Sequence, residues 1–146
     1  MIVAVTGGRD VLPTEAELDA LLRLLDVQRC TTLRHGRASG VDAAAARSMR
    51  RRPAILVEAW PARWRDVAGE LDLSAGPRRS AAMLLGDTRS PAVEWARSDI
   101  PERPRVDVLV AWPGGRGTTA CELVARRHGI QVVRIDELVE RMRGAS

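Results

Sequence analysis

The chain has 146 residues, of which 45% are hydrophobic, 29% are charged and 3% are aromatic. This length suits one domain with one core, and the hydrophobic share excludes wholesale disorder. The formal net charge is +4, and every basic residue is an arginine, so each cationic contact is a guanidinium suited to phosphate or carboxylate. This charge permits an anionic ligand and does not by itself indicate a long nucleic acid.

Cysteine usage and hydropathy exclude several further classes. Cys30 and Cys121 have neither CxxC spacing nor a neighbouring histidine pattern, so neither a disulfide framework nor a zinc site is indicated. No apolar run approaches the roughly 20 residues that a membrane helix needs, and residues 1–6 lack the basic start and length of a signal peptide. We therefore expect a cytoplasmic protein with no metal, no cofactor and no membrane contact.

The first half of the chain alternates short β-branched runs with helical patterns. Residues 2–5 predict a buried strand, and a helix from Pro13 and Thr14 to about residue 27 carries leucines on one face. Residues 31–34 predict a second strand. The alanine-rich stretch 41–51 predicts a second helix that is small enough on its inner face to lie close to a sheet.

The second half continues the alternation around one irregular segment. We predict strands over 55–57, 106–110 and 131–135, and helices over 78–85, 118–128 and 137–142, with Gly129 ending the second of these helices. The segment 86–105 contains prolines and Trp95 without clear periodicity, which is long for a connection in a compact domain. We expect it to be a lid, an interface flap or a mobile loop, with its two ends reaching the two sides of the binding site.

This alternation predicts a single α/β domain over residues 1–146. The expected fold is Rossmann-like and doubly wound, with a mainly parallel five-stranded sheet and helices on both faces. Ligands in such sheets bind at the carboxyl ends of the strands, where the strand order reverses.

Three glycine-rich loops follow three of the predicted strands. Thr6-Gly7-Gly8-Arg9-Asp10 follows the first, and glycine there removes the Cβ that would keep a phosphate from the backbone N–H groups. Residues 35–42 follow the second and open the alanine-rich helix, whose N-terminus is partially positive. Within them, Asp42 either complements the helix charge or accepts hydrogen bonds from ribose hydroxyls, and His35 is interpreted as a structural histidine.

The third loop, Pro113-Gly114-Gly115-Arg116-Gly117-Thr118, lies between a strand and a helix. It matches neither the P-loop, since the lysine is missing, nor GxGxxG. Its glycines and its threonine at the helix start predict a phosphate cradle.

Taken in order, these motifs resemble the YspA/YpsA-related branch of the SLOG superfamily, which includes the "Lonely Guy" phosphoribohydrolases and the DNA-processing protein DprA. The resemblance spans nearly the whole chain. It is carried by the first and third loops, by the pattern Gly36-x-Ala38-x-Gly40-x-Asp42, and by Gly76-Pro77-x-Arg79 with Met83 following. It implies a Rossmann-like fold, a nucleotide or nucleotide-derivative ligand in the glycine loops, and a homodimer.

Two departures from the resemblance bear on catalysis. The phosphoribohydrolases carry a glutamate three residues after the loop threonine, where this chain has Cys121, and Glu122 follows one residue later. One residue is about 100° around a helix, so we expect Glu122 to point away from the site and to pair with Arg126. Arg79 matches the arginine that those hydrolases use, and the residue after it is Ser80 where asparagine is common.

Three functions remain open on the sequence. The first is binding of a phosphate-bearing nucleotide or derivative, ADP-ribose-like or a mononucleotide, by a sensor, carrier or sequestering protein. The second is a phosphoribohydrolase that cleaves the N-glycosidic bond of nucleoside 5′-monophosphates, with Arg79, Asp42 and Glu122 as its candidate catalytic residues. The third is single-stranded DNA binding, which Trp60, Arg63, Trp64 and Arg65 support only weakly, because a core pair explains the tryptophans better. The ligand-binding residues that we predict are Thr6, Gly7, Gly8, Arg9, Gly36, Arg37, Ala38, Gly40, Asp42, Arg79, Gly114, Gly115, Arg116, Gly117 and Thr118.

Overall fold

Five short strands form one sheet in the computed structural model, which describes residues 1–144. The strands are β1 (Ile2–Thr6), β2 (Thr32–His35), β3 (Leu56–Ala59), β4 (Val108–Ala111) and β5 (Gln131–Arg134). All four pairings are parallel, in the order β3-β2-β1-β4-β5. The order reverses between β1 and β4, which is the position where doubly wound sheets bind ligands. The predicted Rossmann-like α/β fold is confirmed, and the sheet is wholly parallel.

Four α-helices connect the strands, and a fifth follows β5. They are α1 (Glu15–Val27), α2 (Val41–Ser48), α3 (Ala75–Leu85), α4 (Arg116–Arg127) and α5 (Ile135–Gly144), and a short 3-10 turn, Met49–Arg51, extends α2. Thr14 begins α1 through a capping box with Glu17. Helix α3 begins three residues before its predicted start, because Pro77 fits the first turn of a helix.

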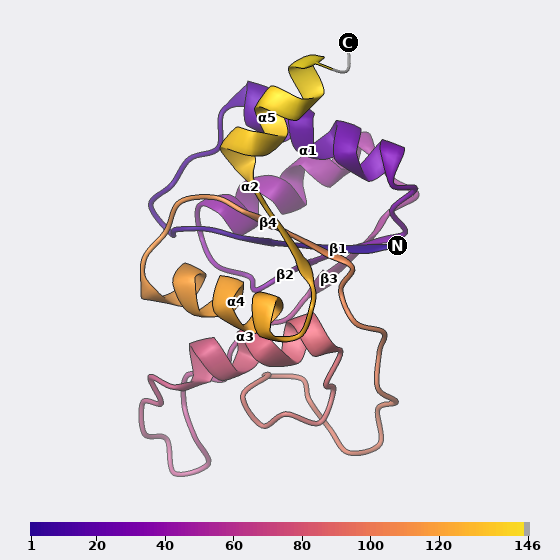
Figure 1. Ribbon diagram of the computed structural model, residues 1–146. Helices are drawn as coiled ribbons and strands as arrows, with labels where there is room; N and C mark the ends of the chain where they lie inside the picture. Colours follow the sequence, from indigo (N-terminus) through magenta and orange to yellow (C-terminus); the bar gives the residue numbers. More distant parts are fainter. Residues whose placement is uncertain (145–146) are drawn as a thin grey trace.

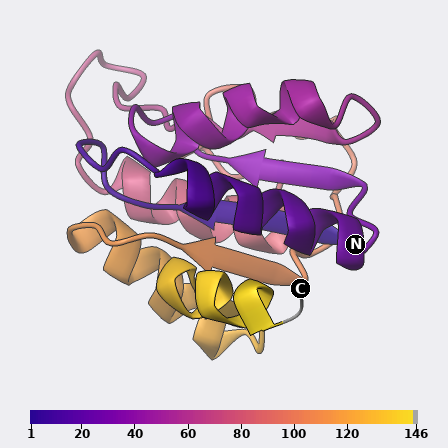
Figure 2. The ribbon, with the colours of Figure 1, turned by 90° about the horizontal axis from the view of Figure 1, so that it is seen from above.

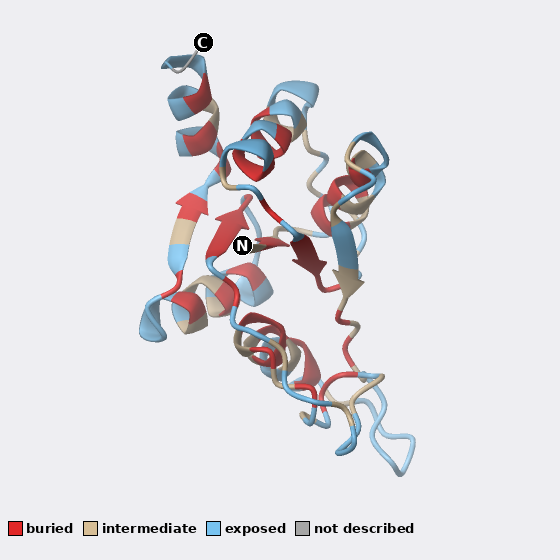
Figure 3. Cartoon of the chain, turned by 90° about the vertical axis from the view of Figure 1, so that its right-hand side faces the viewer, coloured by how far each residue is buried: buried red, intermediate tan, exposed pale blue. Residues whose placement is uncertain are grey.

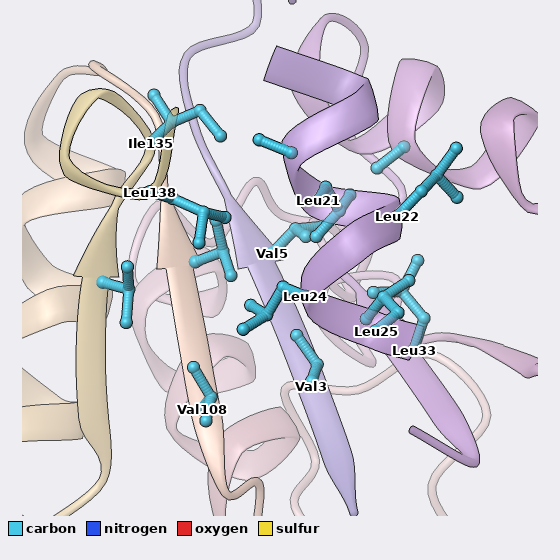
Figure 4. Close-up of a cluster of buried hydrophobic side chains, with 14 of the residues drawn as sticks. Val3, Val5, Leu21, Leu22, Leu24, Leu25, Leu33, Val108, Ile135 and Leu138 are labelled. Carbon is cyan, nitrogen blue, oxygen red and sulfur yellow. The ribbon is translucent and has the colours of Figure 1, made fainter. Parts of the chain in front are cut away.

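The helices cover both faces of the sheet, as predicted (Figure 1). Helices α1, α2 and α5 lie on one face, where alternate strand residues such as Val3, Val5 and Val108 meet the leucines of α1 and Leu138 of α5 (Figure 4). Helices α3 and α4 lie on the other face, where Ala4 and Leu109 pack beneath them. The inner strands are largely buried, whereas both edge strands carry exposed residues (Figure 3).

The segment 86–105 is irregular, as expected, but its ends do not flank the carboxyl edge of the sheet. The segment leaves the end of α3 and returns to β4 on the side where β1 begins (Figure 1). There the Val106 N–H donates to the Leu84 carbonyl, and the Asp107 N–H donates to the Ile2 carbonyl at 2.8 Å. Our expectation was wrong because a helix that follows a parallel strand returns the chain to the amino-terminal edge.

A buried arginine fixes the segment against the β2–β3 side of the sheet. Arg34, 1% exposed, donates to the carbonyls of Met83 and Pro104 and forms a 2.9 Å ion pair with Glu58. Trp95 donates from its ring nitrogen to the Ala59 carbonyl, at 2.8 Å. The segment therefore packs against this part of the sheet in the place of a helix.

Candidate functional site

The three glycine loops meet at the carboxyl edge of the sheet. The Gly8 N–H donates to the Pro113 carbonyl at 2.9 Å, which joins the first loop to the third. The Ser39 hydroxyl donates to the Arg9 carbonyl at 3.3 Å, which joins the second loop to the first. The strand order thus brings together the loops that the sequence predicted as one site.

Packing between the loops accounts for most of the glycines. A Cβ on Gly7 would lie 2.9 Å from the Trp112 side chain, and one on Gly114 would lie 2.9 Å from the Gly8 nitrogen. Gly40 has a φ of +72° and lies against the backbone of the first loop. These glycines are needed so that the loops can touch one another.

Gly115 and Gly117 have no such requirement, because a Cβ on either would meet no atom within 4 Å. Both are exposed and begin α4. Thr118, by contrast, is buried beneath Gly114, so its hydroxyl does not face the open side of the loop. The open surface of the third loop is therefore made by backbone and by Arg116.

The N-terminus of α4 has unsatisfied donors and the wrong charge for a helix start. No side chain caps it, so the first three N–H groups, of residues 116–118, have no intrahelical partner. Its first turn carries no acidic residue and begins with Arg116. An arginine there opposes the helix dipole, which favours an anion at this end.

Asp42 holds the second loop from inside. It is 5% exposed, and its Oδ2 accepts hydrogen bonds from the N–H groups of Gly36 and Ala38, at 2.9 and 3.2 Å. Burial raises the pKa of this carboxyl, and the two amide hydrogen bonds oppose that effect. Its Oδ1 is buried without a hydrogen bond, so a ribose hydroxyl would reach it only after the second loop moved.

Arg79 connects α3 to the second loop. Its guanidinium donates to the carbonyls of Gly36 and Trp60, and burial lowers its pKa. Its Nε is buried without a partner. His35 is also buried, and its Nδ1 accepts from the Arg37 N–H at 2.9 Å, in agreement with a structural role.

Cys121, three residues after Thr118 in α4, belongs to the core between α4 and the sheet. It is wholly buried, and burial raises the pKa of its thiol to about 11, against opposing contributions from the hydroxyls of Thr6 and Ser80. Glu122 points away, with ion-pair distances of 3.7 Å to Arg126 and 3.5 Å to Arg134. The expected pairing of Glu122 with Arg126 is confirmed.

Three exposed arginines stand on the loops without a carboxylate. Arg9, Arg37 and Arg116 form no ion pair within residues 1–144. Arg37 adopts a φ of +60°, and the guanidinium of Arg9 lies 5.5 Å from the centre of the Trp64 ring. The carboxyl edge thus carries three guanidinium groups without an ion pair, and Asp10 of the first loop is an exposed acidic residue beside them.

The sequence analysis missed a hairpin over residues 61–74 beside this surface. Arg65 and Leu71 form an antiparallel bridge, and the Asp72 N–H donates to the Trp64 carbonyl at 2.7 Å. The hairpin projects at the end of the sheet toward which the strands point (Figure 2). Asp66 and Gly69, which form its turn, were the available signal.

Two grooves in residues 1–144 lie away from the glycine loops. A groove of about 770 Å³ lies along β3 and the segment 86–105, lined among others by Val57, Trp95 and Arg103. A second, of about 630 Å³, lies between α1 and α2. At the glycine loops, Arg9, Arg37 and residues 113–117 are exposed to solvent.

Metal clusters and membrane-spanning helices are both absent from the part of the chain that the structure describes. Residues 1–144 contain no group of three or more histidine, cysteine or acidic side chains placed to hold a metal ion. No helix in that range has the length and apolar character needed to cross a membrane. The chain matches no protein-family model, no curated protein and no solved structure.

Proposed function

We propose that the protein binds a phosphate-bearing nucleotide or nucleotide derivative on its glycine loops, as a sensor, carrier or sequestering protein. The observation that carries the proposal is the N-terminus of α4, which is uncapped, begins with Arg116, and has open space over Gly115 and Gly117. A phosphate there would accept the free N–H groups and offset the unfavourable charge of Arg116.

The arginines around this helix end support the same class of ligand. Arg9 and Arg116 come from the two loops that flank the reversal of strand order, and Arg37 comes from the neighbouring loop. Guanidinium groups bind phosphate through paired hydrogen bonds, and these three have no internal carboxylate to release first. The resemblance to the SLOG superfamily supports the proposal independently, through the order of the motifs.

Binding without turnover fits the acidic groups better than hydrolysis does. A phosphoribohydrolase needs a carboxylate beside the glycosidic bond to stabilise the oxocarbenium-like centre or to activate water. Here Glu122 is held by Arg126 and Arg134, Asp42 is enclosed by the second loop, and Cys121 is buried. We therefore place the hydrolase second, and single-stranded DNA binding third.

The test is Gly115→Asp, with binding of AMP, GMP, CMP, UMP and ADP-ribose measured by calorimetry. Because the space over Gly115 is open, we expect the variant to fold, and its carboxylate to repel phosphate and lower affinity at least about tenfold. Ala54→Asp adds the same charge at an exposed position on the amino-terminal side of β3 and should bind like the wild type. Equal affinity of folded Gly115→Asp and wild type would remove the third loop from the site, and release of free base from a monophosphate would favour the hydrolase.

A further inference from the structure

We propose that Trp64 is the stacking platform for the nucleobase of the bound nucleotide. The inference rests on the proposed function, since it places the second half of a ligand whose phosphate lies at the start of α4. It assigns a role to the 61–74 hairpin, which phosphate binding at the glycine loops does not require.

Trp64 differs from the buried tryptophans in its exposure. Trp60 and Trp112 are 0% and 2% exposed and belong to the two cores, whereas Trp64 is 36% exposed. Our expectation that Trp60 and Trp64 form a core pair was therefore wrong for Trp64. A tryptophan exposed to this extent keeps ring surface available for a planar ligand.

Helix α3 holds the ring of Trp64 in place. Gly76, in the first turn of α3, lies so close beneath Trp64 that a Cβ on it would be 2.9 Å from the ring atom Cη2. Arg79 is three residues further on, hence on the same side of the helix, and donates to Gly36 of the second loop. One helix face thus positions both the exposed ring and the second glycine loop.

Arg9 connects the ring to the phosphate end of the site. The guanidinium lies 5.5 Å from the centre of the Trp64 ring, and Arg9 directly follows Gly8, which hydrogen-bonds to Pro113 of the third loop. A nucleotide whose phosphate lies at the third loop would pass Arg9 and reach Trp64 with its base. Arg9 has no ion pair within residues 1–144, so turning from the Trp64 ring toward the phosphate would break its cation–π contact but no ion pair.

A stacked ring contributes affinity without choosing a base, because every base has a π face. We therefore expect similar affinities for nucleotides that carry the same phosphate groups and differ only in their base. The hydrogen-bonding edge of the base would have no part in this contact.

The experiment compares ligands with and without a base on three proteins. Calorimetry measures AMP, GMP, CMP, UMP and ribose 5-phosphate against the wild type, Trp64→Ala and Trp64→Phe. We expect Trp64→Ala to weaken the tightest monophosphate by about 5- to 150-fold while leaving ribose 5-phosphate unchanged. Trp64→Phe should restore most of the loss, because phenylalanine keeps an aromatic face. Leu73→Ala, which shortens another exposed side chain of the same hairpin, should bind like the wild type.

The outcomes separate this inference from the function on which it rests. Unchanged monophosphate affinity in Trp64→Ala would overturn the platform and leave nucleotide binding intact. An equal loss for ribose 5-phosphate and monophosphates would also overturn it, because Trp64 would then act by shaping the loops. If the folded wild type binds neither these compounds nor ADP-ribose, both the platform and the proposed site are wrong.

Discussion

The buried thiol of Cys121 gives the protein a predictable response to alkaline pH. Burial raises the pKa of Cys121 to about 11 and raises that of Cys30 in the same direction. In the unfolded chain both thiols ionise at their ordinary pKa near 9, so between about pH 9 and pH 11 the folded state holds protons that the unfolded state has lost. The stability is therefore fully present below about pH 9 and falls as the pH rises toward 11.

We expect Cys121 to contribute about 2–3 kcal/mol to this fall, since each unit of pKa shift corresponds to about 1.4 kcal/mol. The chain has neither lysine nor tyrosine, so few other side chains titrate in this range. Urea unfolding at a series of pH values should give a shallower decline for Cys121→Ala than for the wild type, whatever the overall stability of the variant. Parallel declines would show that Cys121 ionises as readily in the folded protein as in the unfolded chain.

At single residues, the sequence predicted where the loops are and not what each residue does there. Gly7, Gly114 and Gly117 look alike in the sequence, but the first two make room for protein and the third leaves open space. The difference depends on atoms from other loops, which sequence spacing does not place. Asp42 illustrates the same point, because its two possible roles are separated only by its hydrogen bonds to Gly36 and Ala38.

At the scale of elements, the segment 86–105 should behave as part of the core and not as a lid. Thr88 is wholly buried and donates to the Ile100 carbonyl at 2.8 Å, and Arg34 satisfies the Pro104 carbonyl from below. We expect amide hydrogen exchange in this segment to be slow without nucleotide and unchanged by AMP. Protection that appears only when AMP is added would restore the lid.

Arg34→Met provides the matching perturbation. It leaves Glu58 without its closest cation and the carbonyls of Met83 and Pro104 without this donor, so we expect a loss of about 3–5 kcal/mol in the free energy of unfolding and faster exchange throughout 86–105. Arg51→Met removes an exposed ion pair with Asp19 and should cost less than about 1 kcal/mol. Similar losses for the two variants would contradict the anchoring role of Arg34.

Strongly periodic elements could be predicted from the sequence because their signal is local. The leucine spacing of α1 and the β-branched runs of β1 and β4 can be recognised within a few residues of sequence. The 61–74 hairpin has a single internal bridge, a second bridge to Val93, and no alternating pattern, so its only local signal is the Asp66 turn. The position of Trp64 beside Arg9 depends on this hairpin and could not be predicted.

At the scale of the whole molecule, the parallel sheet and its carboxyl-edge site could be predicted from the order of strands and glycine loops. The strand order itself decides that the first and third loops are neighbours, through β1 and β4. It also leaves β3 at one edge, where Leu56 and Val57 are 59% and 37% exposed. An edge strand with exposed apolar side chains is open to pairing with another chain.

If the protein forms the homodimer that the SLOG resemblance implies, the β3 edge would provide the apolar part of its interface. We therefore expect light scattering to give twice the 16.0 kDa of one chain, and the Tm to rise with protein concentration, because unfolding would be coupled to dissociation. Leu56→Arg places a charge on the exposed face of β3 and should give a folded monomer whose Tm no longer depends on concentration. Leu12→Arg, at an 80% exposed position before α1, is the matched control and should remain dimeric. A wild-type mass of one chain over a hundredfold range of concentration would contradict the dimer, and a dimeric Leu56→Arg would place the interface away from β3.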